Sequence, residues 1–211
     1  LFLLLSSCAG YHFNTSNNPL IGYDIKSVAV PMFINRTNIA GLSPMMTKEI
    51  ILTLNEYSGL RVYGGDHQAA DAVLVGVLES EDLKNKTFKT TETVFTDKKL
   101  QESIGSRTPF YIPIETSYKF TMRIFLIKRP TAQELELLAS ELGKNIVQHP
   151  KVVLKEVLDV SSSFSRVVAD TTSTSSGGDV NFVKNKGVLN KSLEDACVSA
   201  ASNFKQVVLN A

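Results

Sequence analysis

The segment from residue 118 to 127 constrains the fold of this chain more than any other feature. Five large side chains occupy every second position of it, namely Tyr118, Phe120, Met122, Ile124 and Leu126. A period of two places them on one face of an extended strand. A strand with one wholly apolar face must bury that face against another layer, so the chain needs a sheet covered on one side.

Four further segments have strand character. Residues 25–33 predict an edge-tolerant first strand ending near Phe33, because Pro31 cannot donate to a ladder. Residues 60–63 predict a short strand. Residues 70–79 are apolar on both faces, which indicates a central position. Residues 152–168 alternate again and are expected to pair antiparallel with the strand at 118–127.

Three segments have helical spacing. The first begins at Ser43, which is followed by Pro44, and runs to Tyr57. The second, from Thr131 to Gly143, opens on the capping box Thr-Ala-Gln-Glu. The third covers Ser192 to Leu209, with one apolar stripe formed by Leu193, Ala196, Ala200, Phe204 and Val207. The order of elements predicts an α+β two-layer sandwich: two main helices on a mostly antiparallel or mixed four-stranded sheet, with a short extra helix between the late strands.

Charge and cysteine content limit the classes of function. Lys plus Arg total 22 against 21 for Asp plus Glu, so nothing steers the whole chain toward nucleic acid. The two cysteines are Cys8 and Cys197. Cys197 lies beside the apolar stripe of the last helix and is expected to be a buried small hydrophobe. If Cys8 is acylated, no intramolecular disulfide can form.

The first eight residues resemble a bacterial lipobox. Leu1 to Leu5 form an apolar run too short to span a bilayer, followed by Ser6, Ser7 and Cys8. The chain opens without Met or a positive segment, so we expect residues 1–7 to be the remnant of a signal peptide. In this interpretation Cys8 is lipidated, and Ala9 after it implies sorting to the outer membrane, on the periplasmic side. The alternative is that Cys8 is an ordinary residue after a conventional signal.

Residues 8–24 are rich in Asn and Ser and include Pro19 and Gly22, which predicts an extended tether. Residues 25–211 are then expected to form a single domain.

Three segments resemble the LPS-assembly lipoprotein family LptE of diderm bacteria: the start Cys-Ala-Gly-Tyr-His-Phe at 8–13, residues 25–37, and Ala-Asp-Ala-Val-Leu-Val-Gly at 70–76. The resemblance implies a non-catalytic subunit without cofactors that sits partly inside an LptD-type β-barrel and contacts lipopolysaccharide. The Val-Ala-Val-Pro-x-Phe pattern also resembles curli-secretion and synthase-activator lipoproteins. The alternative function is therefore a periplasmic lipoprotein that activates a peptidoglycan synthase or forms part of a secretion apparatus. The helix at 131–143 and the Ser/Thr/Gly loop at 170–179 would enlarge a minimal member of the family.

Catalytic and metal-binding patterns are missing from the sequence. The three histidines are far apart, and none has a second His or Cys at metal-ligand spacing. Nucleophile elbows, Cys-x-x-Cys pairs and phosphate-binding glycine loops are absent as well. We expect no enzyme activity, no metal and no cofactor. Acidic pairs such as Glu79 with Glu81 and Glu134 with Glu136 are interpreted as solvated surface.

The one locally basic stretch lies between residues 84 and 107, with Phe88 and Phe95 among its basic side chains. Lys84, Lys86 and Lys89 are candidates for binding lipopolysaccharide, because ammonium groups pair with phosphate oxygens. The alternative, which we favour, is an exposed loop kept soluble by its lysines. Lys119 and Arg123 form a second candidate pair on one strand face, about 13 to 14 Å apart by the strand rise. A solvated face is the alternative there too.

Overall fold

The computed structural model describes residues 17–80, 88–95, 111–139, 150–166 and 182–209. Cys8, Lys84, Lys86 and the expected loop at 170–179 lie outside these ranges, as does the predicted helix end at Gly143.

Within these described ranges, seven strands form one sheet. They are β1 (Ser27–Val30), β2 (Ile34–Arg36), β3 (Arg61–Gly64), β4 (Ala72–Glu79), β5 (Phe88–Phe95), β6 (Tyr111–Lys128) and β7 (Val152–Ser165). The helices are α1 (Leu42–Asn55), α3 (Ala132–Ala139) and α4 (Phe182–Phe204), with a 3-10 turn at Ile21–Tyr23 and a π turn at Lys205–Leu209. The predicted α+β class is confirmed, but a four-stranded sheet was too small. Five segments were assigned as strands from the sequence, and the sheet contains two more. β2 was missed because it has only three residues, and β5 because its Thr-rich sequence lacks apolar alternation.

The long strand β6 organises the sheet, whose main order is β3-β1-β4-β6-β5. Its second half pairs with β4 and its first half with β5, while β7 runs antiparallel along its other side. β1, β2 and β3 join by parallel pairing, so the sheet is mixed. The central position of β4 and the antiparallel pairing of β7 with β6 are both confirmed.

The first strand is interior, not at an edge. β1 lies between β3 and β4, and its four residues are all buried. The sequence predicted a strand that would tolerate an edge and end near Phe33, but β1 ends at Val30. Pro31 lies just past the last ladder residue, so its missing N–H does not interrupt the pairing on either side.

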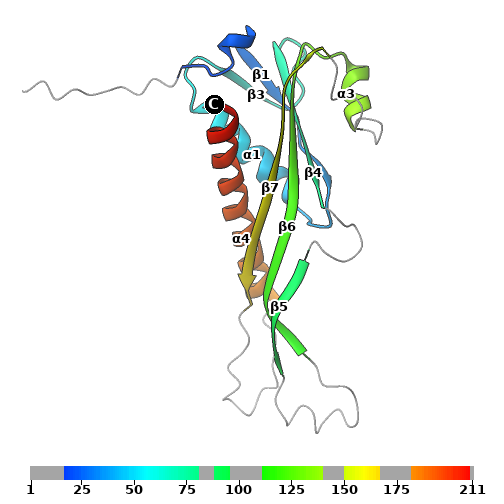
Figure 1. Ribbon diagram of the computed structural model, residues 1–211, viewed down its shortest axis with the longest axis vertical. Helices are drawn as coiled ribbons and strands as arrows, with labels where there is room; N and C mark the ends of the chain where they lie inside the picture. Colours follow the sequence, from blue (N-terminus) through cyan, green and yellow to red (C-terminus); the bar gives the residue numbers. More distant parts are fainter. Residues whose placement is uncertain (1–16, 81–87, 96–110, 140–149, 167–181, 210–211) are drawn as a thin grey trace, which may run out of the picture.

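Helices α1 and α4 cover one face of the sheet, which we call the helix face (Figure 1). The five alternating residues of β6 from Tyr118 to Leu126 all point to it and are at most 2% exposed. The predicted covering layer is therefore formed by these two helices. The third helix, α3, joins β6 to β7 as expected, and both halves of its capping box form: Glu134 accepts from the Thr131 amide at 2.6 Å, and Thr131 Oγ1 from the Glu134 amide at 3.3 Å.

Two helix boundaries differ from the sequence prediction. α1 is capped by Gly41 at a φ of 76°, a conformation that suits glycine, and not by Ser43. α4 begins ten residues before Ser192. Its predicted stripe is buried except for Val207, which is 52% exposed. The π turn changes the helical period there, so Leu209 enters the core in place of Val207.

The expected tether is packed onto the domain from Asn18 onward. The Asn18 side chain is buried, donates to the Ile25 carbonyl at 2.6 Å and accepts from the Leu20 amide at 2.9 Å. Leu20 is 2% exposed. These contacts place the start of the packed domain several residues before position 25.

Candidate outer-face binding site

The face of the sheet opposite α1 and α4, which we call the outer face, changes character along β6. Near the end of β6 it carries a buried apolar cluster that includes Val73, Val75, Phe125 and Ile127. Leu135 of α3 packs against this cluster. Toward the start of β6 the same face becomes polar and basic.

An ionic centre lies between the two regions. The Glu79 carboxylate pairs with Arg36 at 3.1 Å and with Arg123, whose guanidinium contacts its other oxygen. The side chain of Glu79 is only 18% exposed, so its interpretation as solvated surface was wrong. Burial of one carboxylate between two guanidiniums links β2, β4 and β6. Arg123 is therefore engaged within the fold.

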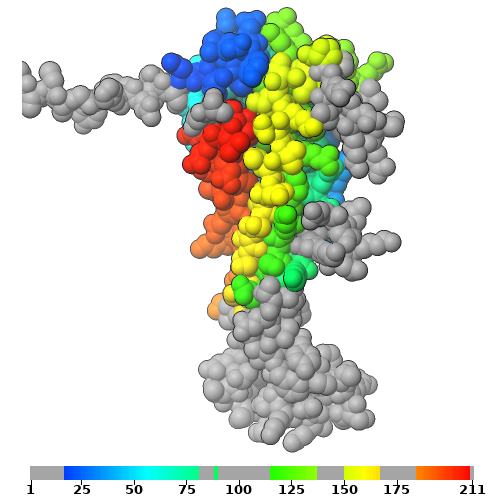
Figure 2. Space-filling model, in the orientation of Figure 1, coloured from blue at the N-terminus to red at the C-terminus, as the bar shows by residue number. Residues whose placement is uncertain are grey.

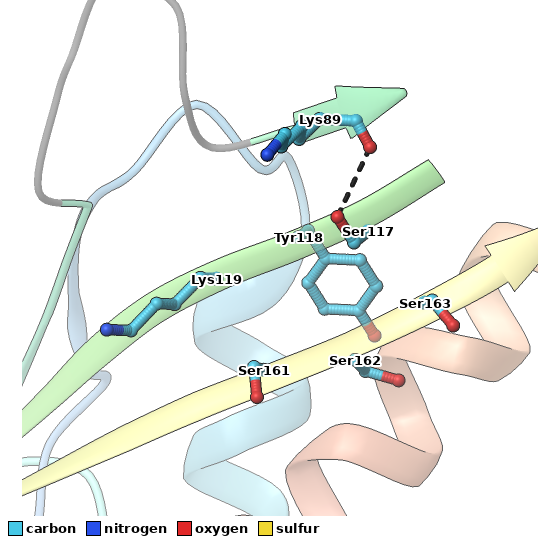
Figure 3. A pocket seen from close by; sticks show the side chains of 7 residues that line it. All are labelled: Lys89, Ser117, Tyr118, Lys119, Ser161, Ser162 and Ser163. Carbon is cyan, nitrogen blue, oxygen red and sulfur yellow. Dashed lines mark hydrogen bonds between the residues drawn. The ribbon is translucent and has the colours of Figure 1, made fainter. Parts of the chain in front are cut away.

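A cleft of about 400 Å³ opens on the outer face beyond this centre. It is lined by Lys89, Ser117, Tyr118, Lys119, Ser161, Ser162 and Ser163 (Figure 3). The pairing register of the strands brings these side chains together. Lys89, Ser117 and Ser163 lie opposite one another on β5, β6 and β7, and Lys119 lies opposite Ser161. Ser117 also donates to the Lys89 carbonyl at 3.2 Å, which ties β5 to β6 beneath the lysine side chain.

The two lysines of the cleft are accessible to a ligand. Lys119 pairs with Asp159 at 3.4 Å, but the side chains are 49% and 63% exposed, so solvent screens the pair strongly. Lys89 is exposed and has no ion-pair partner among the described residues. Both side chains extend toward the same side of the cleft in Figure 3. Ammonium groups beside serine hydroxyls offer hydrogen-bond donors to an anionic oxygen group such as phosphate.

The strands that form the floor of the cleft are joined to α4 by polar contacts on the helix face. The Tyr118 hydroxyl donates to the Ser192 carbonyl at 2.8 Å and lies 3.0 Å from the Ser192 hydroxyl. Ser192 Oγ in turn donates to the Ser163 carbonyl at 3.1 Å. These bonds connect β6, β7 and α4 beneath the cleft.

Of the predicted site residues, the structure brings Lys89 and Lys119 together and holds Arg123 in the ionic centre, while Lys84 and Lys86 lie outside the described residues. Lys89 and Lys119 line one cleft although thirty positions separate them in sequence. Lys89 was assigned to a loop but belongs to strand β5. Ser117, Ser161 and Ser163 were not predicted as site residues. The Ser-Ser-Ser run at 161–163 was a usable signal, since three adjacent hydroxyls within one strand place polar groups on both of its faces.

Other titratable groups are explained by local contacts. A hydrogen bond from Lys151, with the Thr131 amide adding to it, lowers the pKa of Glu134 to about 2. Burial raises the pKa of the Cys197 thiol to about 12, and Glu49 and Glu194 add to the shift. Cys197 is 0% exposed, which confirms its role as a buried hydrophobe.

Within the described ranges, no cluster of His, Cys, Asp or Glu is arranged to hold a metal ion. Among the helices in those ranges, none is long and apolar enough to cross a membrane.

Comparison with known proteins gives a partial likeness of fold. No protein-family model matches the chain, and no curated protein matches it in sequence. A Caulobacter crescentus protein provisionally described as a lipoprotein is similar at 9% identity, with 84% of this chain and 88% of that chain covered and a TM-score of 0.42. PelC from Paraburkholderia phytofirmans, solved as a dodecamer, has 13% identity, coverages of 85% and 84%, and a TM-score of 0.40. Lipoprotein GNA1162 from Neisseria meningitidis has 11% identity, coverages of 78% and 96%, and a TM-score of 0.34. Lipoproteins thus occur among the structures with some likeness to this fold, and at these values the likeness assigns neither a family nor a function.

Proposed function

We propose that this chain is an outer-membrane lipoprotein that binds lipopolysaccharide through the outer-face cleft and works with an LptD-type β-barrel. The lipobox-like start supports the anchor at Cys8, and the resemblance of residues 8–13 to LptE supports the partner. The binding of this ligand is proposed because Lys89 and Lys119 converge with the outer-face serines Ser117, Ser161 and Ser163 in one cleft. The chain acts as a non-catalytic adaptor without a cofactor.

The chemistry of the cleft suits the phosphorylated end of lipopolysaccharide. Phosphate oxygens accept charge-assisted hydrogen bonds from ammonium groups and further bonds from hydroxyls. A volume of about 400 Å³ accommodates a phosphate with part of its sugar, not the acyl chains of a whole lipid. The acyl chains would then remain outside the cleft. Lys84 and Lys86, which precede β5 in sequence, stay additional candidates.

Binding of purified lipid A to the chain with Cys8→Ser tests the ligand. The double variant Lys89→Gln and Lys119→Gln is expected to bind diphosphoryl lipid A about tenfold more weakly at low salt, equivalent to about 1.4 kcal/mol. The loss should shrink at high salt because both lysines are exposed. The matched control is Lys48→Gln with Lys186→Gln, which removes the same charge from exposed positions on α1 and α4.

A second comparison isolates the phosphate. Wild type should bind diphosphoryl lipid A more tightly than the monophosphoryl form, and the cleft double variant should discriminate less between them. Equal losses in the cleft and control variants would refute the assignment of the ligand to this cleft.

The partner requires an experiment in the native envelope. Crosslinking of the lipidated chain, followed by identification of the captured protein, is expected to recover an LptD-type barrel. Recovery of a peptidoglycan synthase or a secretion component without the barrel would favour the alternative function instead.

A further inference from the structure

Strand β7 presents a long edge to its surroundings. It has 14 residues, and the only described strand that pairs with it is β6. Figure 2 shows β7 in yellow as a continuous ridge between α4 in red and β6 in green. The backbone groups on the far side of such a strand form a template for another strand, and proteins usually protect an edge of this length.

The outer-face side chains at the middle of β7 follow a pattern of cation, apolar group and anion. Lys155, Val157 and Asp159 occupy successive outward positions, and all three are exposed. Val157 is 50% exposed. Lys155 has no ion-pair partner in the part of the chain that the structure describes.

We infer that β7 pairs antiparallel with β7 of a second copy of this chain, about a twofold axis through Val157. In that register Val157 lies opposite itself, and Lys155 of each copy lies opposite Asp159 of the other. Opposite charges directly across two antiparallel strands attract, and the twofold axis repeats the pair. On the helix face, Leu154 lies opposite Val160 of the second copy, and Glu156 lies opposite Leu158.

The charge pattern selects this register over its neighbours. Moving the axis one residue either way places Val157 opposite a charged side chain and leaves the other charge unmatched. The Asp159 carboxylate can accept the new contact. One oxygen pairs with Lys119 and the other accepts from Thr121, but a carboxylate offers about four acceptor positions and this side chain is 63% exposed. The regular pairing extends from Leu154 to Val160, since the register shift beside Val153 ends the flat part of the edge.

Cysteine crosslinking tests the register directly. The full chain carrying Cys8→Ser leaves only Cys197, which is buried. Val157→Cys in this background is expected to form an intermolecular disulfide under a mild oxidant, because opposite residues of an antiparallel pair are separated by a distance that a disulfide can bridge. Ser163→Cys is the matched control on the same exposed face. Its two copies would lie about 40 Å apart in the proposed dimer, from the strand rise.

Charge reversal tests the recognition independently. Lys155→Glu and Asp159→Lys should each weaken self-association by about tenfold or more in sedimentation velocity. Each substitution places two like charges opposite each other, and the twofold axis repeats this repulsion. A mixture of the two variants should recover dimers, since the mixed pair restores both attractions. A monomeric wild type at high micromolar concentration, equal crosslinking at positions 157 and 163, or no recovery in the mixture would each overturn the proposal. Because these measurements contain no lipid and no barrel, their failure is independent of the proposed function.

Discussion

Replacement of Gly76 by alanine probes how closely the core is packed. Gly76 lies on the helix face of β4, and a Cβ placed there would lie 2.2 Å from the ring of Phe33. The ring would have to retreat by about 1.2 Å to reach the 3.4 Å at which ordinary contact begins. Phe33 is 2% exposed and its amide is tied to Thr47 Oγ1 at 3.0 Å, so it has little room to move.

The expected cost follows from these distances. Overpacking a core by one methyl group lowers the free energy of unfolding by about 1–3 kcal/mol. Truncation of a buried Phe to Ala lowers it by about 3–5 kcal/mol, which is an upper bound for the effect of displacing Phe33. We expect Gly76→Ala to lower the free energy of unfolding by about 2 to 3 kcal/mol. For a domain of this size that corresponds to a decrease in Tm of roughly 4–12 °C. Urea denaturation followed by circular dichroism measures the change.

The same substitution at Gly187 is the control. That glycine is exposed within α4, and an added Cβ meets no atom within 4 Å. Gly187→Ala should stabilise the protein by about 0.5–1 kcal/mol, because alanine restricts the unfolded chain and favours the helix. Phe33→Leu should lower the free energy of unfolding by less in the Gly76→Ala background than in the wild type. A neutral or stabilising Gly76→Ala would refute the reasoning.

Three further predictions concern polar and titratable groups. Tyr118→Phe should lower the free energy of unfolding by about 1 kcal/mol, since the buried ring stays while its bond to Ser192 is lost; an unchanged denaturation midpoint would contradict this. The pKa of Glu134 is about 2 in the folded state against its ordinary value of 4.5, so its stabilising contribution is present above pH 4.5 and is lost as pH falls toward 2. Lys151→Met should weaken that pH dependence, measured by unfolding between pH 6 and 2.5; an identical slope would count against the Lys151 contact. Because the pKa of Cys197 is about 12, its thiol should resist alkylation at pH 8 in the native protein and react only after denaturation, as mass spectrometry would detect; rapid native labelling would show that the last helix opens.

Local patterns predicted the elements whose environment is decided by their own sequence. The alternation from Tyr118 to Leu126 identified a strand and its buried face, and Thr131 with Glu134 identified a helix start. Both signals act over a few residues and need no knowledge of distant parts. The prediction failed where neighbours decide the outcome: β1 is interior because β3 pairs alongside it, and Val207 is exposed because the helix changes period before it.

The candidate site was only partly accessible from sequence for the same reason. Lysines could be singled out by type, but nothing local indicates that Lys89 and Lys119 share a cleft while Arg123 is held by Glu79. That outcome depends on which residues of β5, β6 and β7 are placed opposite one another.

By itself, the sequence determined that this chain forms a helix-covered sheet, that it lacks recognisable catalytic patterns and that it begins with a lipobox-like segment. Periodicity and residue type carry that information, because burial of an alternating strand is favourable wherever the strand lies. Only the tertiary structure decided which polar groups face one another. The cleft on the outer face, the ionic centre at Glu79 and the open edge of β7 all arise from strand register, and register is set by pairing between segments far apart in the chain.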